Sequence, residues 1–182
     1  MATNKPVEIL ELFGELDFIQ DDLKWFVVHT KPRCEKKLAT YSFQYKINYY
    51  LPLIDSIQQY ENRKVKFTKP MFPGYVFVNC SIEDKRKLTF TGYIAYWLEV
   101  KNQQELINDL KQIYAGRQLG VEFVRAEYLK EGTKVEIQRG PFAGLIGFVK
   151  NQKNVTEVIL QVTLLRQAVS VSAKTDQIRV IN

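Results

Sequence analysis

Cationic side chains with aromatic and amide neighbours are the first group in this sequence whose chemistry points to a partner. They fall between residues 31 and 44 and are Lys31, Arg33, Lys36, Lys37, Tyr41 and Gln44. Lysine and arginine bind phosphates through their charge, whereas a ring or an amide can stack on or hydrogen-bond an unpaired base. The group therefore predicts a nucleic-acid contact along a helix. An ordinary solvated helix surface, with Tyr41 turned to the apolar side, is the alternative.

A second group lies in the sequence KPMFPGYVFVNC, residues 69–80. Tyr75 and Phe77 alternate with two valines, so a strand would carry both rings on one face and the valines on the other. Aromatic residues at alternate strand positions serve either as core or as the anchor of a contact with a partner helix. The two prolines and Gly74 would fix the backbone around Phe72 and present its ring beside the other two.

A third group consists of the cations Arg63, Lys64 and Lys66, in the polar stretch at residues 55–70. Beyond Lys64 the cations alternate with apolar residues, as in a projecting hairpin arm. Such an arm could lie against nucleic acid, although exposed hairpins also carry lysine to remain soluble.

The charge of the chain is unevenly distributed. The net charge is +6 at pH 7, but residues 1–24 hold six acidic residues and two lysines, which leaves +10 on the remaining residues. A basic body favours a polyanionic partner. The acidic N-terminal extension, residues 1–24, contains apolar residues that fit either one short amphipathic helix or a mobile tail.

Residue types for catalysis and metal binding are scarce. His29 is the only histidine, and Cys34 and Cys80 are the only cysteines, without a CxxC spacing. No phosphate-binding loop, nucleophile elbow or zinc-peptidase motif is present. We therefore expect neither an enzyme nor a cofactor or metal site. The two cysteines resemble reduced thiols, and no signal sequence or apolar run of membrane length is found, which together indicate a cytoplasmic protein.

The elements that must position these groups follow from hydrophobic periodicity and capping residues. The order strand, helix, strand, strand, helix, strand predicts a split βαβ arrangement, an α+β fold in which helices cover one side of an antiparallel sheet. We expect this domain at residues 25–115. Its strands are predicted at 25–29, 49–54, 75–80 and 93–100, its helices at 33–47, 82–88 and from 102, and the arm at 55–70.

From about residue 130 the apolar residues recur almost purely with a period of two, between tight glycine turns. Five short strands predict a small SH3-like all-β barrel at residues 130–182, after a linker at 116–129. Each glycine in a helix costs about 1 kcal/mol and a proline about 3 kcal/mol, so the glycines and proline between residues 140 and 147 disfavour a helix. We therefore expect the barrel and no alternative helical form of this segment.

Two stretches resemble a known family. WFVVHTKPRCEKKLA together with KPMFPGYVFV is similar to the N-terminal (NGN) domain of NusG-type transcription elongation factors, and EGTKVEIQRGPFAGLIGFV is similar to the KOW motif of their C-terminal barrel. The two matches cover residues 25–182. Within the family, the chain is more similar to the gene-specific antitermination factors, of the RfaH or capsule-operon type, because the arm is compact and no domain is inserted.

The resemblance implies a transcription elongation or antitermination factor that binds the clamp helices of RNA polymerase and suppresses pausing or termination at specific operons. The residues that match the polymerase-binding patch are His29, Phe72, Tyr75 and Phe77. The cationic helix would bind the non-template DNA strand in the transcription bubble, and the arm would lie on the opposite side of the polymerase cleft or on upstream DNA. We expect a monomer with no membrane partner. The alternative is a KOW-type RNA-binding or ribosome-associated protein.

In the family, the barrel binds Rho or a small-subunit ribosomal protein through a loop near its fourth strand. The matching residues are Leu165, Arg166 and Gln167, where the housekeeping pattern has an aromatic residue, a glycine and an arginine. This departure argues against Rho as a partner and leaves the small subunit of the ribosome open.

Overall fold

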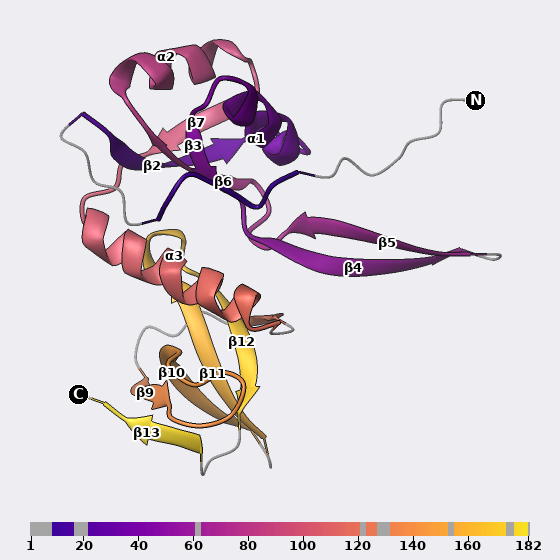
Figure 1. The fold of residues 1–182 in the computed structure, drawn as a ribbon, viewed down its shortest axis with the longest axis vertical. Coiled ribbons are helices and arrows are strands. Elements are labelled where there is room, and N and C mark those ends of the chain that lie inside the picture. Colours follow the sequence, from indigo (N-terminus) through magenta and orange to yellow (C-terminus); the bar gives the residue numbers. More distant parts are fainter. Residues whose placement is uncertain are drawn as a thin grey trace. The chain divides into compact units, whose positions relative to one another are not determined.

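The computed structural model describes residues 9–16, 22–60, 63–120, 123–126, 132–152, 155–173 and 177–181. Its contacts divide the chain into two compact units, residues 1–103 and 104–182. Figure 1 shows the helices and strands that make up each unit. In the described part of the chain, no helix is long and apolar enough to span a membrane.

The first unit is built on a five-stranded antiparallel sheet with the strand order β1-β3-β6-β2-β7. Strands β2, β3, β6 and β7, with one helix after β2 and another after β6, form the split βαβ arrangement that the sequence predicts. The predicted α+β class is therefore confirmed. The elements of this sheet domain are β1 (Leu12–Phe13), β2 (Lys24–Thr30), α1 (Glu35–Gln44), β3 (Asn48–Tyr50), β6 (Tyr75–Cys80), α2 (Ile82–Phe90) and β7 (Ile94–Leu98).

An apolar cluster packs α1 and α2 against the sheet. It joins Leu38 of α1 and Leu88 of α2 to Val76 and Val78 of β6, and all four side chains are 0% exposed. The two valines of β6 therefore share one strand face, as the strand period predicts, and this face lies in the core beneath the helices. Helix α2 begins at the predicted residue, and Ser81 caps it, because the Ser81 hydroxyl accepts a hydrogen bond from the Asp84 N–H at 3.1 Å.

The N-terminal extension contributes a strand, so the helix predicted there is wrong for residues 9–16. Leu12 and Phe13 of β1 pair with β3. The unpaired edge of β3 offers backbone hydrogen-bonding groups that a strand satisfies and a helix cannot. Gly14 ends β1 with a φ of +91°, and a Cβ at this position would lie 2.5 Å from Cγ of Asn48, so a glycine is required. Residues 1–8 and 17–21 of the predicted extension lie outside the described residues.

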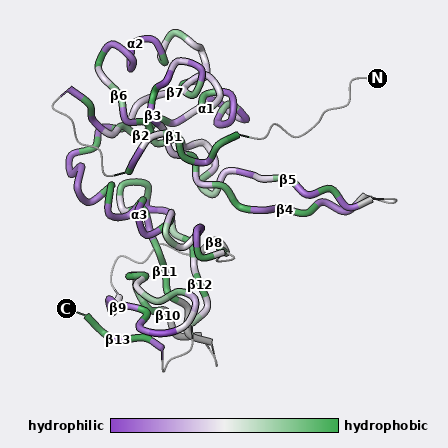
Figure 2. Tube along the Cα trace, in the orientation of Figure 1, coloured by the Kyte–Doolittle hydropathy of each residue, from purple (hydrophilic) through white to green (hydrophobic). Residues whose placement is uncertain are grey.

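The predicted hairpin arm is confirmed. β4 (Leu53–Tyr60) and β5 (Arg63–Pro70) form a separate two-stranded sheet that is paired over its whole length. Figure 1 shows this arm projecting from the sheet domain, and Figure 2 shows that hydrophilic residues dominate its outer part. The single strand predicted at residues 49–54 is divided into β3 and the start of β4, because Pro52 has no N–H to continue a ladder.

The second unit contains nearly all of α3 (Gln103–Gln118) and a six-stranded antiparallel sheet with the order β13-β9-β10-β11-β12-β8. Alternate residues of its strands, such as Val135, Ile137, Val169 and Val171, are at most 1% exposed. The predicted all-β character of residues 130–182 is confirmed for the described residues. The elements are β8 (Val124–Ala126), β9 (Thr133–Ile137), β10 (Ile146–Gln152), β11 (Val155–Val162), the 3-10 turn η1 (Thr163–Leu165), β12 (Gln167–Ala173) and β13 (Ile178–Val180).

Regular structure extends into the segment predicted as the linker, residues 116–129. Helix α3 continues to Gln118, and β8 pairs with β12. The division into compact units falls after Gln103, so α3 is grouped with the barrel. The domain limits at 25–115 and 130–182 stay a prediction.

Candidate functional site

Three rings on neighbouring strands form a row across the sheet. His29 of β2 lies directly opposite Tyr75 of β6 on one side and Tyr96 of β7 on the other. The His29 and Tyr96 rings are stacked, with centroids 4.5 Å apart and planes inclined by 7°. The Tyr75 ring meets the His29 ring edge-on, at 4.9 Å and 76°. We call His29, Tyr75 and Tyr96 the aromatic row.

The aromatic row is accessible. His29 and Tyr75 are half-buried, and Tyr96 is 48% exposed. Burial, with a smaller effect of the neighbouring Tyr96 hydroxyl, raises the pKa of Tyr75, so its phenol keeps its proton at neutral pH. Rings that combine apolar faces with hydroxyl groups are well suited to a partner surface that is apolar at its centre and polar at its rim.

The turn at Gly74 sets the position of the aromatic row. Its N–H donates to Oε1 of Glu35 at 2.8 Å, and its carbonyl accepts from the Thr30 N–H at 2.7 Å. The φ of Gly74 is +85°, and a Cβ there would lie 3.1 Å from Nε2 of His29. The tight turn predicted from the FPGY sequence is therefore anchored by the first residue of α1, a role for Glu35 that the sequence did not indicate.

Phe72 and Phe77 are buried, with exposed fractions of 2% and 0%. The two rings lie edge-on with centroids 6.3 Å apart, and Tyr50 of β3 lies 6.4 Å from Phe77. Phe77 does share a strand face with Tyr75, but the expectation that Phe72 and Phe77 present their rings at the surface is not met. The strand period assigns a face, whereas accessibility depends on the residues packed around it.

The cations predicted around α1 divide into two kinds. Lys31, Arg33 and Lys37 are exposed. Lys36 donates from Nζ to the carbonyl and hydroxyl oxygens of Thr68 in β5, at 2.8 and 3.0 Å, and its burial lowers its pKa. Three of the four cations are therefore available to a polyanion, and the fourth holds the arm.

The aromatic and amide residues of the predicted DNA-binding group lie at the end of α1. Tyr41 and Tyr45 are stacked with centroids 4.4 Å apart. Tyr41 is half-buried and packs against the core, whereas Gln44 is exposed and Tyr45 is 58% exposed. Tyr45 is therefore the more accessible of the two rings.

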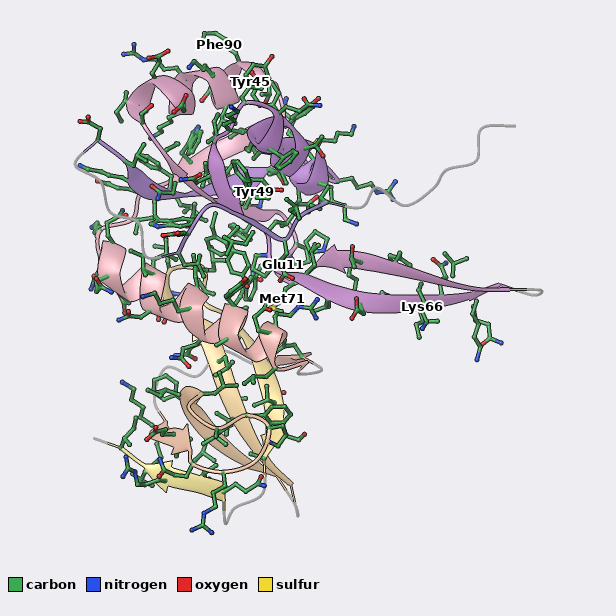
Figure 3. The ribbon with its side chains drawn as sticks, in the orientation of Figure 1. Glu11, Tyr45, Tyr49, Lys66, Met71 and Phe90 are labelled. Atoms are coloured by element: carbon green, nitrogen blue, oxygen red, sulfur yellow. The ribbon has the colours of Figure 1, made fainter. Side chains whose placement is uncertain are left out.

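Sequence reasoning missed Phe90 and Tyr96. Phe90 ends α2 and is 90% exposed, the largest fraction of any described large apolar side chain. The predicted helix stopped at Leu88, so Phe90 was not considered, and Figure 3 shows it at the end of α2. Tyr96 lies in a strand that was predicted, but its position beside His29 follows from the register between β2 and β7.

The predicted arm cations lie on β5. Lys64 and Lys66 are exposed, and Lys66 pairs across the ladder with Ile57, which is 62% exposed. The side chain of Arg63 lies outside the described residues. Lys64 and Lys66 therefore lie on one face of the arm, because residues two apart in a strand point the same way.

The predicted partner loop of the barrel connects η1 to β12. Arg166 is exposed in the left-handed region, with a φ of +51°, between the half-buried Leu165 and Gln167. At the start of η1, the Thr163 N–H donates to Oδ2 of Asp109 in α3 at 2.8 Å. Burial raises the pKa of Asp109 to about 6 despite this hydrogen bond.

The rings and cations described above are suited to binding a partner. Among the described residues, no three His, Cys, Asp or Glu side chains gather to hold a metal ion. Burial raises the pKa of Cys80 to about 12, which leaves a protonated and unreactive thiol. The accessible chemistry consists of rings on the sheet, cations and rings at α1 and α2, and cations on the arm.

Comparisons with known proteins assign the sheet domain to a family. The model of the NusG family, described as transcription termination factor nusG, matches residues 23–114. Among solved structures, the crystal structure of the MjSpt4:Spt5 complex in conformation B is similar, with 18% identity, a TM-score of 0.29, and coverage of 87% of this chain and 97% of that chain. No curated protein matches the chain.

Proposed function

The chain belongs to the NusG family, which consists of transcription factors, and on this premise we propose that it is an elongation or antitermination factor that binds the clamp helices of RNA polymerase through the aromatic row. One observation carries the proposal. The stacked and partly exposed rings of His29, Tyr75 and Tyr96 lie within the residues that the family model matches.

The aromatic row supplies the features of an interface hot spot. Rigid rings that already contact one another lose little conformational entropy when a partner covers them. Tyrosine is enriched among residues whose truncation costs the most binding energy. The buried Phe72 and Phe77 contribute by supporting the strand and turn that carry Tyr75. A factor held in this way across the polymerase cleft keeps the enzyme closed on nucleic acid and so reduces pausing and termination.

The cations around α1 bind the non-template DNA strand in the transcription bubble. Lys31, Arg33 and Lys37 neutralise phosphates, and Gln44 and the stacked tyrosines, Tyr41 and Tyr45, contact unpaired bases. Phe90 adds a stacking surface at the end of α2. Arg63, Lys64 and Lys66 place further charge on the arm, against upstream DNA or the far side of the cleft.

We further propose a specialised role at particular operons, like that of the RfaH-type factors. The barrel then takes the small subunit of the ribosome, not Rho, as its partner through Leu165, Arg166 and Gln167. The exposed Arg166 supports a polar contact at this loop.

The direct test is capture of purified RNA polymerase by the full chain, with Tyr75→Ala and Tyr96→Ala as variants and Tyr45→Ala as the matched control. We expect at least about tenfold weaker capture for each row variant and little change for the control. In vitro transcription through a pause site then reports function. Equal capture by all variants would remove the aromatic row from the interface. Binding to structured RNA in the absence of polymerase would favour the KOW-type RNA-binding alternative.

A further inference from the structure

The arm is a two-stranded ladder that no other described strand joins. A two-stranded hairpin is only marginally stable in water without further packing. The direction in which Lys64 and Lys66 are held must therefore depend on contacts where the arm leaves the sheet domain. Figure 3 shows Glu11 and Met71 at this junction and Lys66 farther out along the arm.

Two charged side chains bind the two strands of the arm at this junction. Oε1 of Glu11 accepts a hydrogen bond from the N–H of Leu53, the first residue of β4, at 3.0 Å. On the other strand, Nζ of Lys36 donates to both the carbonyl and the hydroxyl oxygen of Thr68, at 2.8 and 3.0 Å. Hydrogen bonds to an ionised group are roughly twice as strong as those between neutral groups.

Glu11 is in turn fixed by the backbone around it. Its carbonyl accepts from the Leu51 N–H at 2.8 Å, and the Leu10 carbonyl accepts from the Tyr49 hydroxyl at 2.8 Å. Burial raises the pKa of Tyr49 to about 12, so this hydroxyl remains a donor at any physiological pH. The carboxylate of Glu11 is therefore presented to the start of the arm from a rigid position.

The segment that presents Glu11 lies outside the residues that the family model matches. The match begins at residue 23, and β1 lies before it. Phe13 of β1 packs edge-on against Phe43 of α1, with ring centroids 5.1 Å apart. The same helix carries Lys36, so β1 and α1 are joined to each other and to opposite strands of the arm.

We propose that Glu11 and Lys36 form a brace that sets the direction of the arm, and that the N-terminal extension supplies the acidic half of this brace. The effect of the brace on transcription rests on the proposed function, because it matters there only if polymerase or nucleic acid lies against the arm. The brace also explains why Lys36, unlike the exposed cations near it, is partly buried: its ammonium group is bonded to Thr68.

Amide exchange, measured by NMR on the full chain, tests the acidic half directly. Glu11→Ala removes the acceptor of the Leu53 N–H but leaves the backbone acceptor of the Leu51 N–H. Exchange at Leu53 should become about tenfold faster or more, with a much smaller change at Leu51. Glu15→Ala is the matched control, because Glu15 is an exposed acid of the same segment. Glu11→Gln keeps an oxygen acceptor and should restore most of the protection.

Residual dipolar couplings test whether the brace sets direction. In the wild type, the couplings of the amides in β4 and β5 should fit the same alignment tensor as the couplings of the amides in β2 and β6. In Glu11→Ala and in Lys36→Met, the arm couplings should shrink while those of the sheet remain unchanged, because the arm moves and the domain stays folded. Unchanged arm couplings in both variants would overturn the proposal.

Transcription separates this inference from the proposed function. Glu11→Ala should capture polymerase as well as the wild type but suppress pausing less, and Glu11→Gln should recover the activity. If the wild type has no effect on transcription, the proposed function fails, and the couplings alone decide whether the brace exists.

Discussion

The His29 ring lies flat against the Tyr96 ring, with centroids 4.5 Å apart and planes inclined by 7°. The two residues are paired across neighbouring strands, so the stack is fixed by backbone register and not only by side-chain contact. Tyr96 therefore belongs to the same surface as the residues that match the polymerase-binding patch.

Tyr96→Ala should weaken polymerase capture about as much as Tyr75→Ala does, by at least about tenfold, because truncation removes an anchor and frees the His29 ring. Binding is measured by titration of purified polymerase. Tyr45→Ala, which removes a ring of similar exposure on the opposite, helical side, is the control. A loss in all three variants would indicate a general effect of surface tyrosines rather than this surface.

Gly74→Ala should lower the free energy of unfolding more than Gly92→Ala does. Both glycines have positive φ, of +85° and +74°, so each alanine carries a backbone strain of about 1–2 kcal/mol. Only at Gly74 would the added Cβ also meet His29, at 3.1 Å from Nε2, whereas nothing lies within 4 Å of that position at Gly92. Urea unfolding of the two variants measures the difference. Equal losses would show that the contact with His29 adds nothing.

Phe90→Ala should reduce binding to single-stranded DNA without changing stability. A stacking residue contributes about 1–3 kcal/mol per base, which corresponds to a loss of at least about fivefold in affinity. Because Phe90 is 90% exposed, the free energy of unfolding should change by less than about 0.5 kcal/mol. Fluorescence anisotropy with short oligonucleotides gives the affinity. Ile82→Ala, at the other end of α2 and 58% exposed, is the control. Equal affinities for Phe90→Ala and this control would exclude stacking on Phe90.

The stability of the second unit should fall as the pH rises, because burial disfavours the charged form of Asp109. The pKa of Asp109 is raised from 3.8 to about 6 in the folded chain, so the folded state binds more protons than the unfolded state between these two values. The stability that Asp109 contributes is therefore full below pH 4 and is lost as the pH rises through about 6. The change is on the order of 3 kcal/mol.

Asp109→Asn removes this titration and keeps an oxygen that can accept from Thr163. Its unfolding free energy, measured with urea from pH 4 to pH 7.5 and followed at barrel amides, should vary less with pH than that of the wild type. Asp55→Asn changes an exposed acid of the other unit and serves as the control. Identical pH profiles for Asp109→Asn and the wild type would contradict the raised pKa.

Several elements were readable from the sequence because they depend on local physics. The alternation from Tyr75 to Val78 predicted both β6 and its core face, and Ser81 with Asp84 marked the start of α2. Glycine turns and a period of two predicted the strands of residues 130–182. The order of strands and helices then limited the fold to few topologies.

The tertiary structure decided what surrounds each side chain. The pairing of β2 with β7 places Tyr96 beside His29. Residues 12 and 13, which fit a helix in the sequence, form β1 because they pair with the edge of β3. Lys36 is less accessible than the other cations around α1 because it donates to Thr68. Packing of distant residues around them also buries Phe72 and Phe77. The sequence by itself determined most of the elements, the two faces of β6 and the family, since period, capping and motif are local properties. Accessibility and partners depend on residues distant in the chain, and only the folded structure brings these together.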